Sequence, residues 1–186
     1  MTLLSIAQAA AGELSIQVPT AVFSATAPGE RQLLALANRT GIELAGTHNW
    51  PILQRETTFT LASGTAEYAM PSDFDRITRR TSWDRNDHWE LLGPMTPQEW
   101  QWRKSGIVAT SPRRRYRLKP SATTPYALKY VIDPTPAAGD VGSIMVFEYI
   151  SNGWCRNAAG DTFRAAWGSD TDVGVLDEDL LTLGLI

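Results

Sequence analysis

The spacing of apolar residues changes near Trp50, and this change constrains the fold more than any other feature of the sequence. Before Trp50, apolar residues recur every three or four positions, which is the period of an amphipathic helix. After it, apolar and β-forming residues alternate with polar ones, which is the period of a strand. Helices followed by a run of strands are typical of α+β proteins. We therefore expect N-terminal helices, a small antiparallel β body with one inserted short helix, and a C-terminal helical tail.

Four helices are expected from the pattern of caps and stops. Residues 2–14 begin with Thr2, a good N-cap, and Pro28 stands in the first turn of a helix over residues 28–46, where its missing N–H is tolerated. Residues 96–106 begin with Thr96-Pro97 and a glutamate three residues after the cap, and they end at Gly106. The last helix starts after Asp177 and has acidic residues in its first turn.

The β body is expected to consist of short strands between turns. A hairpin is predicted across residues 56–71, with Ser63-Gly64 as its turn. The remaining predictions are an extended segment in residues 73–83, a second hairpin or loop in residues 84–94, and strands in residues 113–119, 126–133 and 143–151. We interpret residues 1–186 as a single domain with a helical part (1–46), a β-rich body (50–160) and a C-terminal segment (176–186).

The composition argues against several classes of protein. The net charge of −3 gives no global attraction to nucleic acid or to an anionic membrane, so any DNA contact has to be local. No stretch approaches the about 18–20 apolar residues of a membrane span, and the first 14 residues do not resemble a signal peptide. The single cysteine, Cys155, excludes an internal disulfide framework and fits assembly in a reducing cytoplasm.

No pattern of catalytic residues is present in the sequence. The two histidines, His48 and His88, stand alone, and with one cysteine they do not provide a set of metal ligands. No nucleophile motif or nucleotide-binding loop is found. We expect a protein that is not an enzyme and has no cofactor.

Two groups of residues suggest contact with a partner. Alternation places Arg113, Arg115 and Arg117 on one face of a strand, either as a solvated edge or as a surface along DNA phosphates. Trp100 and Trp102 are two positions apart, so on a helix they face in different directions. One of them can be buried while the other is free for a partner, although exposed tryptophans also stack on sugars in carbohydrate-binding modules.

An ordered series of segments carries a resemblance to a known family. The series is RQLLALANRTGIELA, then THNWPILQRETTFTLASGTAEYAMPSDFDRITRRTSWDR, LLGPMTPQEWQWRKSGIVATSPRRRYRL, MVFEYISNGWC and LDEDLLTLGLI. It covers most of residues 27–186, and its most specific part is the combination of PSDFDR, WDR and PMTPQEW. With this series the sequence resembles the head–tail adaptor (connector) proteins of tailed bacteriophages.

The resemblance implies a structural virion protein at the neck, assembled in the host cytoplasm. Such proteins form a ring, usually of twelve copies, between the portal protein and a tail or nozzle protein. The ring extends the DNA channel, contacts packaged DNA without sequence specificity and provides the platform for tail attachment. Two alternatives remain open: a stopper or tail-completion subunit of the same joint, and, from a different class, a carbohydrate-binding module.

The C-terminal segment is predicted to dock on the portal or on a neighbouring subunit. Its apolar residues are Leu180, Leu181, Leu183, Leu185 and Ile186. A helix this short is below the about 12–15 residues needed for marginal stability alone, so we expect residues 177–186 to become ordered only against a partner. The alternative is that the segment packs back on the β body of its own chain.

Overall fold

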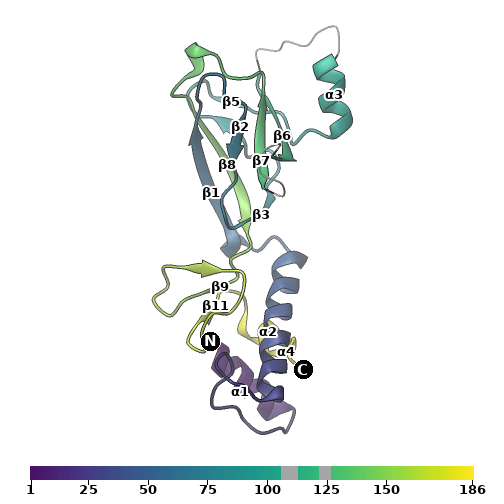
Figure 1. Ribbon diagram of the computed structural model, residues 1–186, viewed down its shortest axis with the longest axis vertical. Coiled ribbons are helices and arrows are strands. Elements are labelled where there is room, and N and C mark those ends of the chain that lie inside the picture. The colour runs from purple at the N-terminus through teal and green to yellow at the C-terminus, as the bar shows by residue number, and fades with distance from the viewer. Residues whose placement is uncertain (106–112, 122–126) are drawn as a thin grey trace. The chain divides into compact units, whose positions relative to one another are not determined.

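The computed structural model describes residues 1–105, 113–121 and 127–186. These residues form two compact units: unit 1 consists of Met1–Gln54 and Ile150–Ile186, and unit 2 consists of Arg55–Tyr149. Figure 1 shows that both termini belong to unit 1. The described residues combine helices with antiparallel strands, so the predicted α+β class is confirmed. Each part of the predicted organisation is one continuous stretch of sequence. Unit 1, in contrast, combines residues from both ends of the chain.

Unit 1 contains most of the helical residues. Its helices are α1 (Leu3–Glu13), α2 (Pro28–Thr47), the short 3-10 helix η1 (Pro51–Leu53) and α4 (Glu178–Leu183). The predicted cap of α1 is confirmed, because Thr2 Oγ1 accepts a hydrogen bond from the backbone N–H of Ser5 at 3.2 Å. Pro28 is the first residue of α2, as predicted, and the helix continues one residue beyond the expected stop at Gly46.

The core of unit 1 is built around two tryptophans that follow the β body in sequence. Trp154 and Trp167 are buried, and their rings meet edge to face with centroids 5.1 Å apart. Apolar side chains from α1, α2 and α4 pack in the same cluster. Gly41 in α2 has no Cβ, and a Cβ there would lie 2.4 Å from the Trp154 ring. The glycine inside the helix pattern therefore allows α2 to approach this ring closely.

The turn-rich residues after the long C-terminal strand form a small sheet in unit 1. Its strands are β9 (Cys155–Arg156), β10 (Phe163–Arg164) and β11 (Val173–Gly174), in the order β10-β9-β11. Both neighbours pair antiparallel with β9. This sheet lies within residues 152–175, which are rich in glycine, aspartate and asparagine.

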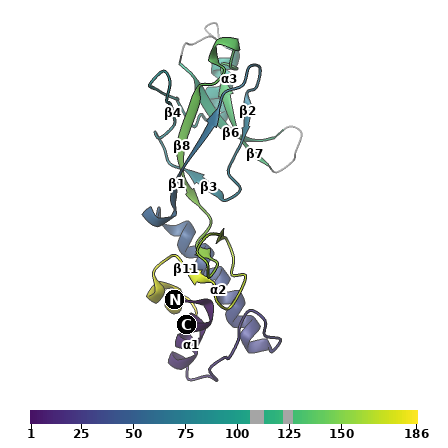
Figure 2. The same ribbon diagram turned by 90° about the vertical axis from the view of Figure 1, so that its left-hand side faces the viewer.

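Unit 2 contains two antiparallel sheets. The first has the order β1-β8-β4-β5, with β3 also paired to β8, and the second has the order β2-β7-β6. The strands of the first sheet are β1 (Gln54–Thr60), β3 (Phe74–Ile77), β4 (Trp83–Asp84), β5 (Trp89–Glu90) and β8 (Ile144–Ser151). Those of the second are β2 (Glu67–Ala69), β6 (Arg115–Pro120) and β7 (Leu128–Asp133). Figures 1 and 2 show the strands of unit 2 from two sides.

Stacked aromatic rings join the two sheets of unit 2. Tyr116 in β6 stacks on Tyr130 in β7 with ring centroids 4.4 Å apart, and Tyr130 stacks on Phe147 in β8 at 5.1 Å. These rings belong to one buried cluster with residues of both sheets. On β8, Met145, Phe147 and Tyr149 point into this cluster, so the residues between them point to the outer face of the first sheet.

The predicted hairpin across residues 56–71 is wrong. A turn is present, with Gly64 at a φ of 73°, but β1 pairs with β8 and β2 pairs with β7. The turn therefore leads from the first sheet to the second. Phe59 and Tyr68 meet with ring centroids 4.5 Å apart in the core of unit 2. Alternation of apolar residues predicts which side chains are buried, but it does not identify the strand that supplies the hydrogen bonds.

The other predicted elements of the β body are present. The hairpin predicted in residues 84–94 is formed by β4 and β5, with Trp83 opposite Glu90 and Asp84 opposite Trp89, so it begins one residue earlier. The three long strands lie at the predicted positions, although Tyr126 lies outside the described residues. The inserted helix is α3 (Pro97–Ser105), and its predicted stop at Gly106 also lies outside them. The short 3-10 helix η2 (Ala138–Asp140) precedes β8.

Candidate functional site

Arg113, just before β6, and Arg115 and Arg117, within it, occupy different environments. Tyr116 and Leu118 pack in the core of unit 2, so Arg115 and Arg117 lie on the outer side of the second sheet, as the alternation predicted. Arg115 is only 2% exposed, and its guanidinium forms an ion pair with the carboxylate of Asp133. Arg113 is exposed and Arg117 is partly exposed. Of the three arginines, therefore, Arg113 and Arg117 reach the surface, and Arg115 has a structural role in unit 2.

Arg114 forms a partly buried ion network that sequence reasoning missed. Its guanidinium contacts the carboxylates of Asp84, in the β4–β5 hairpin, and Asp140, in η2, and lies 3.6 Å from that of Asp87. Asp84 also accepts hydrogen bonds from the backbone N–H groups of Asn86 and Asp87, at 2.9 and 3.1 Å. Arg114 therefore fixes the hairpin and η2 in unit 2. The only signal in the sequence is the group of acids around Asp84, which is typical of any turn.

The C-terminal segment packs on helices of its own unit. Leu181 and Leu185 are 2% and 3% exposed and belong to the core of unit 1, where α4 contacts α1 and α2. The expectation that residues 177–186 become ordered only against a partner is therefore wrong. The alternative, packing on the chain's own β body, agrees with the structure in part, because Leu181 also lies against Gly174 of a short strand and shares its core with Ile150 and Trp154. The predicted cap is confirmed, since Asp177 Oδ1 accepts hydrogen bonds from the N–H groups of Asp179 and Leu180.

The remaining apolar residues of this segment are exposed. Leu183 is 61% exposed, and Leu180 and Ile186 are also exposed. Leu183 lines a hollow of about 250 Å³ together with Glu13, Asp179 and Thr182. Two faces of α4 thus differ, one holding unit 1 together and the other presenting apolar side chains to solvent.

Trp100 and Trp102 face in different directions, as their spacing predicted. Trp100 is buried and Trp102 is 71% exposed. The guanidinium of Arg103 lies 5.4 Å from the centroid of the Trp102 ring, and Lys104 Nζ lies 5.7 Å from that of Trp100. Trp102 therefore combines an exposed apolar surface with an adjacent positive charge.

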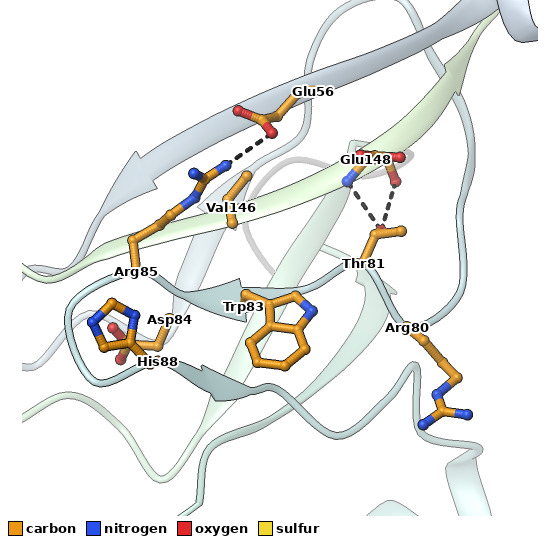
Figure 3. Close-up of a pocket in the computed structure, with 9 residues that line it drawn as sticks. All are labelled: Glu56, Arg80, Thr81, Trp83, Asp84, Arg85, His88, Val146 and Glu148. Atoms are coloured by element: carbon orange, nitrogen blue, oxygen red, sulfur yellow. Dashed lines mark hydrogen bonds and ion pairs between the residues drawn. The ribbon is translucent and has the colours of Figure 1, made fainter.

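A hollow of about 420 Å³ lies on the outer face of the first sheet, and no sequence pattern predicted it. It is lined by Glu56, Arg80, Thr81, Trp83, Asp84, Arg85, His88, Val146 and Glu148. Figure 3 shows the indole of Trp83 in the middle of these residues. Arg85 donates to Glu56 at 2.9 Å, and Thr81 Oγ1 accepts a hydrogen bond from the backbone N–H of Glu148 at 3.1 Å.

The residues examined for metal or covalent chemistry have structural environments. His48, at the C-terminal end of α2, contacts the Trp50 ring edge to face at 5.3 Å. Cys155 is buried, and desolvation raises the pKa of its thiol to about 12. Within residues 1–105, 113–121 and 127–186, no three His, Cys, Asp or Glu side chains are grouped so that they could hold a metal ion. In the same ranges, no helix has the length and apolar character needed to cross a membrane.

Comparison with known families identifies this arrangement. The family model of the SU10 adaptor protein matches residues 1–183. The chain belongs to the SU10 adaptor protein family. The match extends over the N-terminal residues as well as the segments that carried the resemblance, so the predicted relation to phage adaptors is confirmed. No curated protein matches the sequence of this adaptor. The adaptor is thus a phage virion component from a structural family.

Proposed function

We propose that the adaptor forms a ring between the portal protein and the tail. The ring contains about twelve copies, extends the DNA channel, provides the platform for the tail or nozzle protein and lies in the neck of the virion. The observation that supports this role best is the family match over residues 1–183. Large exposed apolar side chains in both units, Trp102 and Leu183 above all, are also expected of a protein that works in an assembly.

The exposed face of α4 is the proposed docking surface for the portal or a neighbouring subunit. Leu180, Leu183 and Ile186 supply it, while Leu181 and Leu185 hold the segment on unit 1. Because the segment is already ordered, docking does not incur the full entropic cost of folding ten residues. Repetition around a ring then allows several modest contacts to act together.

Packaged DNA is proposed to pass the outer side of β6. Arg113 and Arg117 reach the surface there and can neutralise phosphates without reading the base sequence. The net charge of −3 means that this attraction is confined to the neighbourhood of these arginines. The proposed role requires no catalytic residue and no cofactor.

Electron microscopy of the phage particle tests this function. The expected result is a ring of this protein at the neck, with one face on the portal and the other on the tail. A mass measurement of the purified protein, alone and with its portal, determines how many copies assemble in each case. A monomer that ignores the portal and binds oligosaccharides contradicts the proposal and favours a carbohydrate-binding module. A ring that closes the channel without contacting the portal favours a stopper.

A further inference from the structure

Helix α3 is attached to unit 2 mainly through Trp100 and Lys104, and most of its other residues are exposed. Its first turn has a capping box, in which Thr96 N–H donates to Glu99 Oε2 at 2.9 Å and Glu99 N–H donates to Thr96 Oγ1 at 3.2 Å. Trp100 is buried, and Lys104 forms an ion pair with Asp133 at the end of β7. Trp102, on the same helix, is 71% exposed. An indole in water is unfavourable unless a partner covers it, and tryptophan is enriched at the centres of interfaces.

The hollow on the first sheet has the properties of a receptor for such a side chain. Trp83, which is 42% exposed, provides apolar surface beside the buried Val146, and the carboxylates of Glu56 and Glu148 lie among the lining residues. Its volume of about 420 Å³ falls within the range of about 300–1,000 Å³ typical of pockets that hold organic ligands.

The hollow and α3 lie on opposite sides of unit 2. Val146 and Glu148 alternate with the core residues of β8, so the hollow is on the outer face of the first sheet. On β7, Ile132 points into the core, and the next residue, Asp133, holds Lys104 of α3 on the outer side of the second sheet. Figure 1 shows α3 and strand β1 on opposite sides of unit 2. One copy cannot fill its own hollow in this arrangement, whereas a head-to-tail neighbour can, and head-to-tail contacts generate rings.

The charges of the two surfaces are complementary. Helix α3 carries Arg103 and Lys104 against one acid, Glu99. The hollow is lined by three carboxylates and two guanidinium groups, and Arg114 pairs with the lining Asp84. The three arginines of this region, Arg80, Arg85 and Arg114, also pair with Glu90, Glu56, Asp87 and Asp140, so acids outnumber arginines among these residues. The positive charge nearest the exposed indole, that of Arg103, would therefore enter a slightly negative surrounding.

Two residues that line the hollow lie in turns and have a backbone conformation that is uncommon outside glycine. Arg80 and His88, both lining residues, have positive φ angles of 63° and 56°. Residues other than glycine seldom adopt this conformation, and where they do, they tend to cluster at binding and catalytic sites.

We infer that Trp102 of one adaptor enters the hollow of the neighbouring copy and packs against Trp83 and Val146, while Arg103 faces Glu148. The partner of α3 is thus a second copy of this chain. This inference rests on the proposed ring, and it assigns the contact between neighbours within that ring.

Assembly of tryptophan variants on the portal tests the inference. The measurement is the adaptor concentration needed for half-maximal ring formation, followed by mass photometry and electron microscopy. We expect Trp102→Ala and Trp83→Ala each to raise this concentration at least tenfold. The matched control is Trp89→Ala, because Trp89 is an exposed tryptophan that pairs opposite Asp84 and does not line the hollow. It should change the concentration less than twofold. Normal assembly by both Trp102→Ala and Trp83→Ala would overturn the inference.

Charge reversal provides a second test that does not depend on the tryptophan variants. Arg103→Glu and Glu148→Arg should each impair assembly, and the double variant should restore it, because every interface then contains the reversed pair. Two impaired single variants without restoration by the double variant would contradict the Arg103–Glu148 assignment. If the wild-type protein forms no ring on its portal, the proposed function itself fails. Rings that assemble equally well in all variants leave the function in place and reject only this interface.

Discussion

The hydroxyl of Thr40 in α2 donates a hydrogen bond of 2.7 Å to the carbonyl oxygen of Gly184, which follows α4. The bond links two residues 144 positions apart in sequence and closes the end of the C-terminal segment on unit 1. We expect Thr40→Val to lower the free energy of unfolding by about 0.5–1.5 kcal/mol, the usual net value of one hydrogen bond. Denaturant titration measures it. Thr47→Val removes an exposed hydroxyl and is the control, with an expected change below about 0.5 kcal/mol.

The two faces of α4 should respond differently to truncation. Leu181→Ala removes a core side chain and should cost about 2–5 kcal/mol in stability. Leu183→Ala removes an exposed side chain and should leave stability within about 0.5 kcal/mol, but it should weaken binding to the portal or to a neighbouring subunit. Thermal unfolding and a portal pull-down separate the two effects. Equal loss of stability in both variants would show that Leu183 is also a core residue.

Gly41 and Gly46 form a matched pair within α2. A Cβ at residue 41 would lie 2.4 Å from the Trp154 ring, whereas a Cβ at residue 46 meets nothing within 4 Å. Gly41→Ala should therefore destabilise unit 1 by about 1–3 kcal/mol through overpacking. Gly46→Ala should stabilise it by about 0.5–1 kcal/mol, because alanine favours the helix. Urea unfolding of both variants checks the opposite signs.

Variants of Arg115 should change the stability of the protein, whereas variants of Arg113 and Arg117 should change its contact with DNA. Arg115→Met leaves Asp133 with Lys104 as its remaining ion-pair partner among those described, and it should cost up to about 3 kcal/mol in stability. Arg113→Glu and Arg117→Glu should leave stability and ring assembly intact but reduce retention of packaged DNA. The DNA content of the particles measures DNA retention, and thermal unfolding measures stability. Normal DNA retention in both variants would contradict the proposed DNA contact.

Cys155 should make the protein less stable in alkaline solution. Burial raises the pKa of its thiol to about 12, whereas the thiol of an unfolded chain titrates near about 8.5. Between these values the unfolded state loses the proton first, so stability is complete below about pH 8.5 and falls as the pH rises toward 12. The folded protein should also resist thiol reagents at pH 8. Cys155→Ala removes the thiol's contribution and should reduce the pH dependence, and fast labelling of the native wild-type protein would contradict the prediction.

Local signals in the sequence predicted the elements of this adaptor better than their partners. The caps at Thr2, Thr96 and Asp177 act over two or three residues, so they can be read directly from the sequence. The positions of the long strands follow from alternation. The pairing of β1 with β8 depends on residues about 90 positions apart, and alternation carries no information about that choice.

The candidate surfaces were predictable only in part. Spacing alone separated Trp100 from Trp102, because on a helix the geometry is fixed by residue number. The burial of Arg115 was not predictable, since its ion-pair partner Asp133 comes from another strand, β7. The hollow around Trp83 combines residues from β1, β4 and β8, and no local pattern indicates that these strands are neighbours.

Unit 2 is a continuous stretch of chain, whereas unit 1 requires the last 37 residues as well as the first 54. During translation, residues 55–149 are therefore available for folding before α1 and α2 can meet Trp154, Trp167 and α4. The hollow and α3 belong to the unit that can fold first, and the exposed leucines of α4 belong to the unit that is completed last. A nascent adaptor thus acquires its proposed contacts with sister copies before its proposed portal-binding surface, which sets a temporal order for assembly.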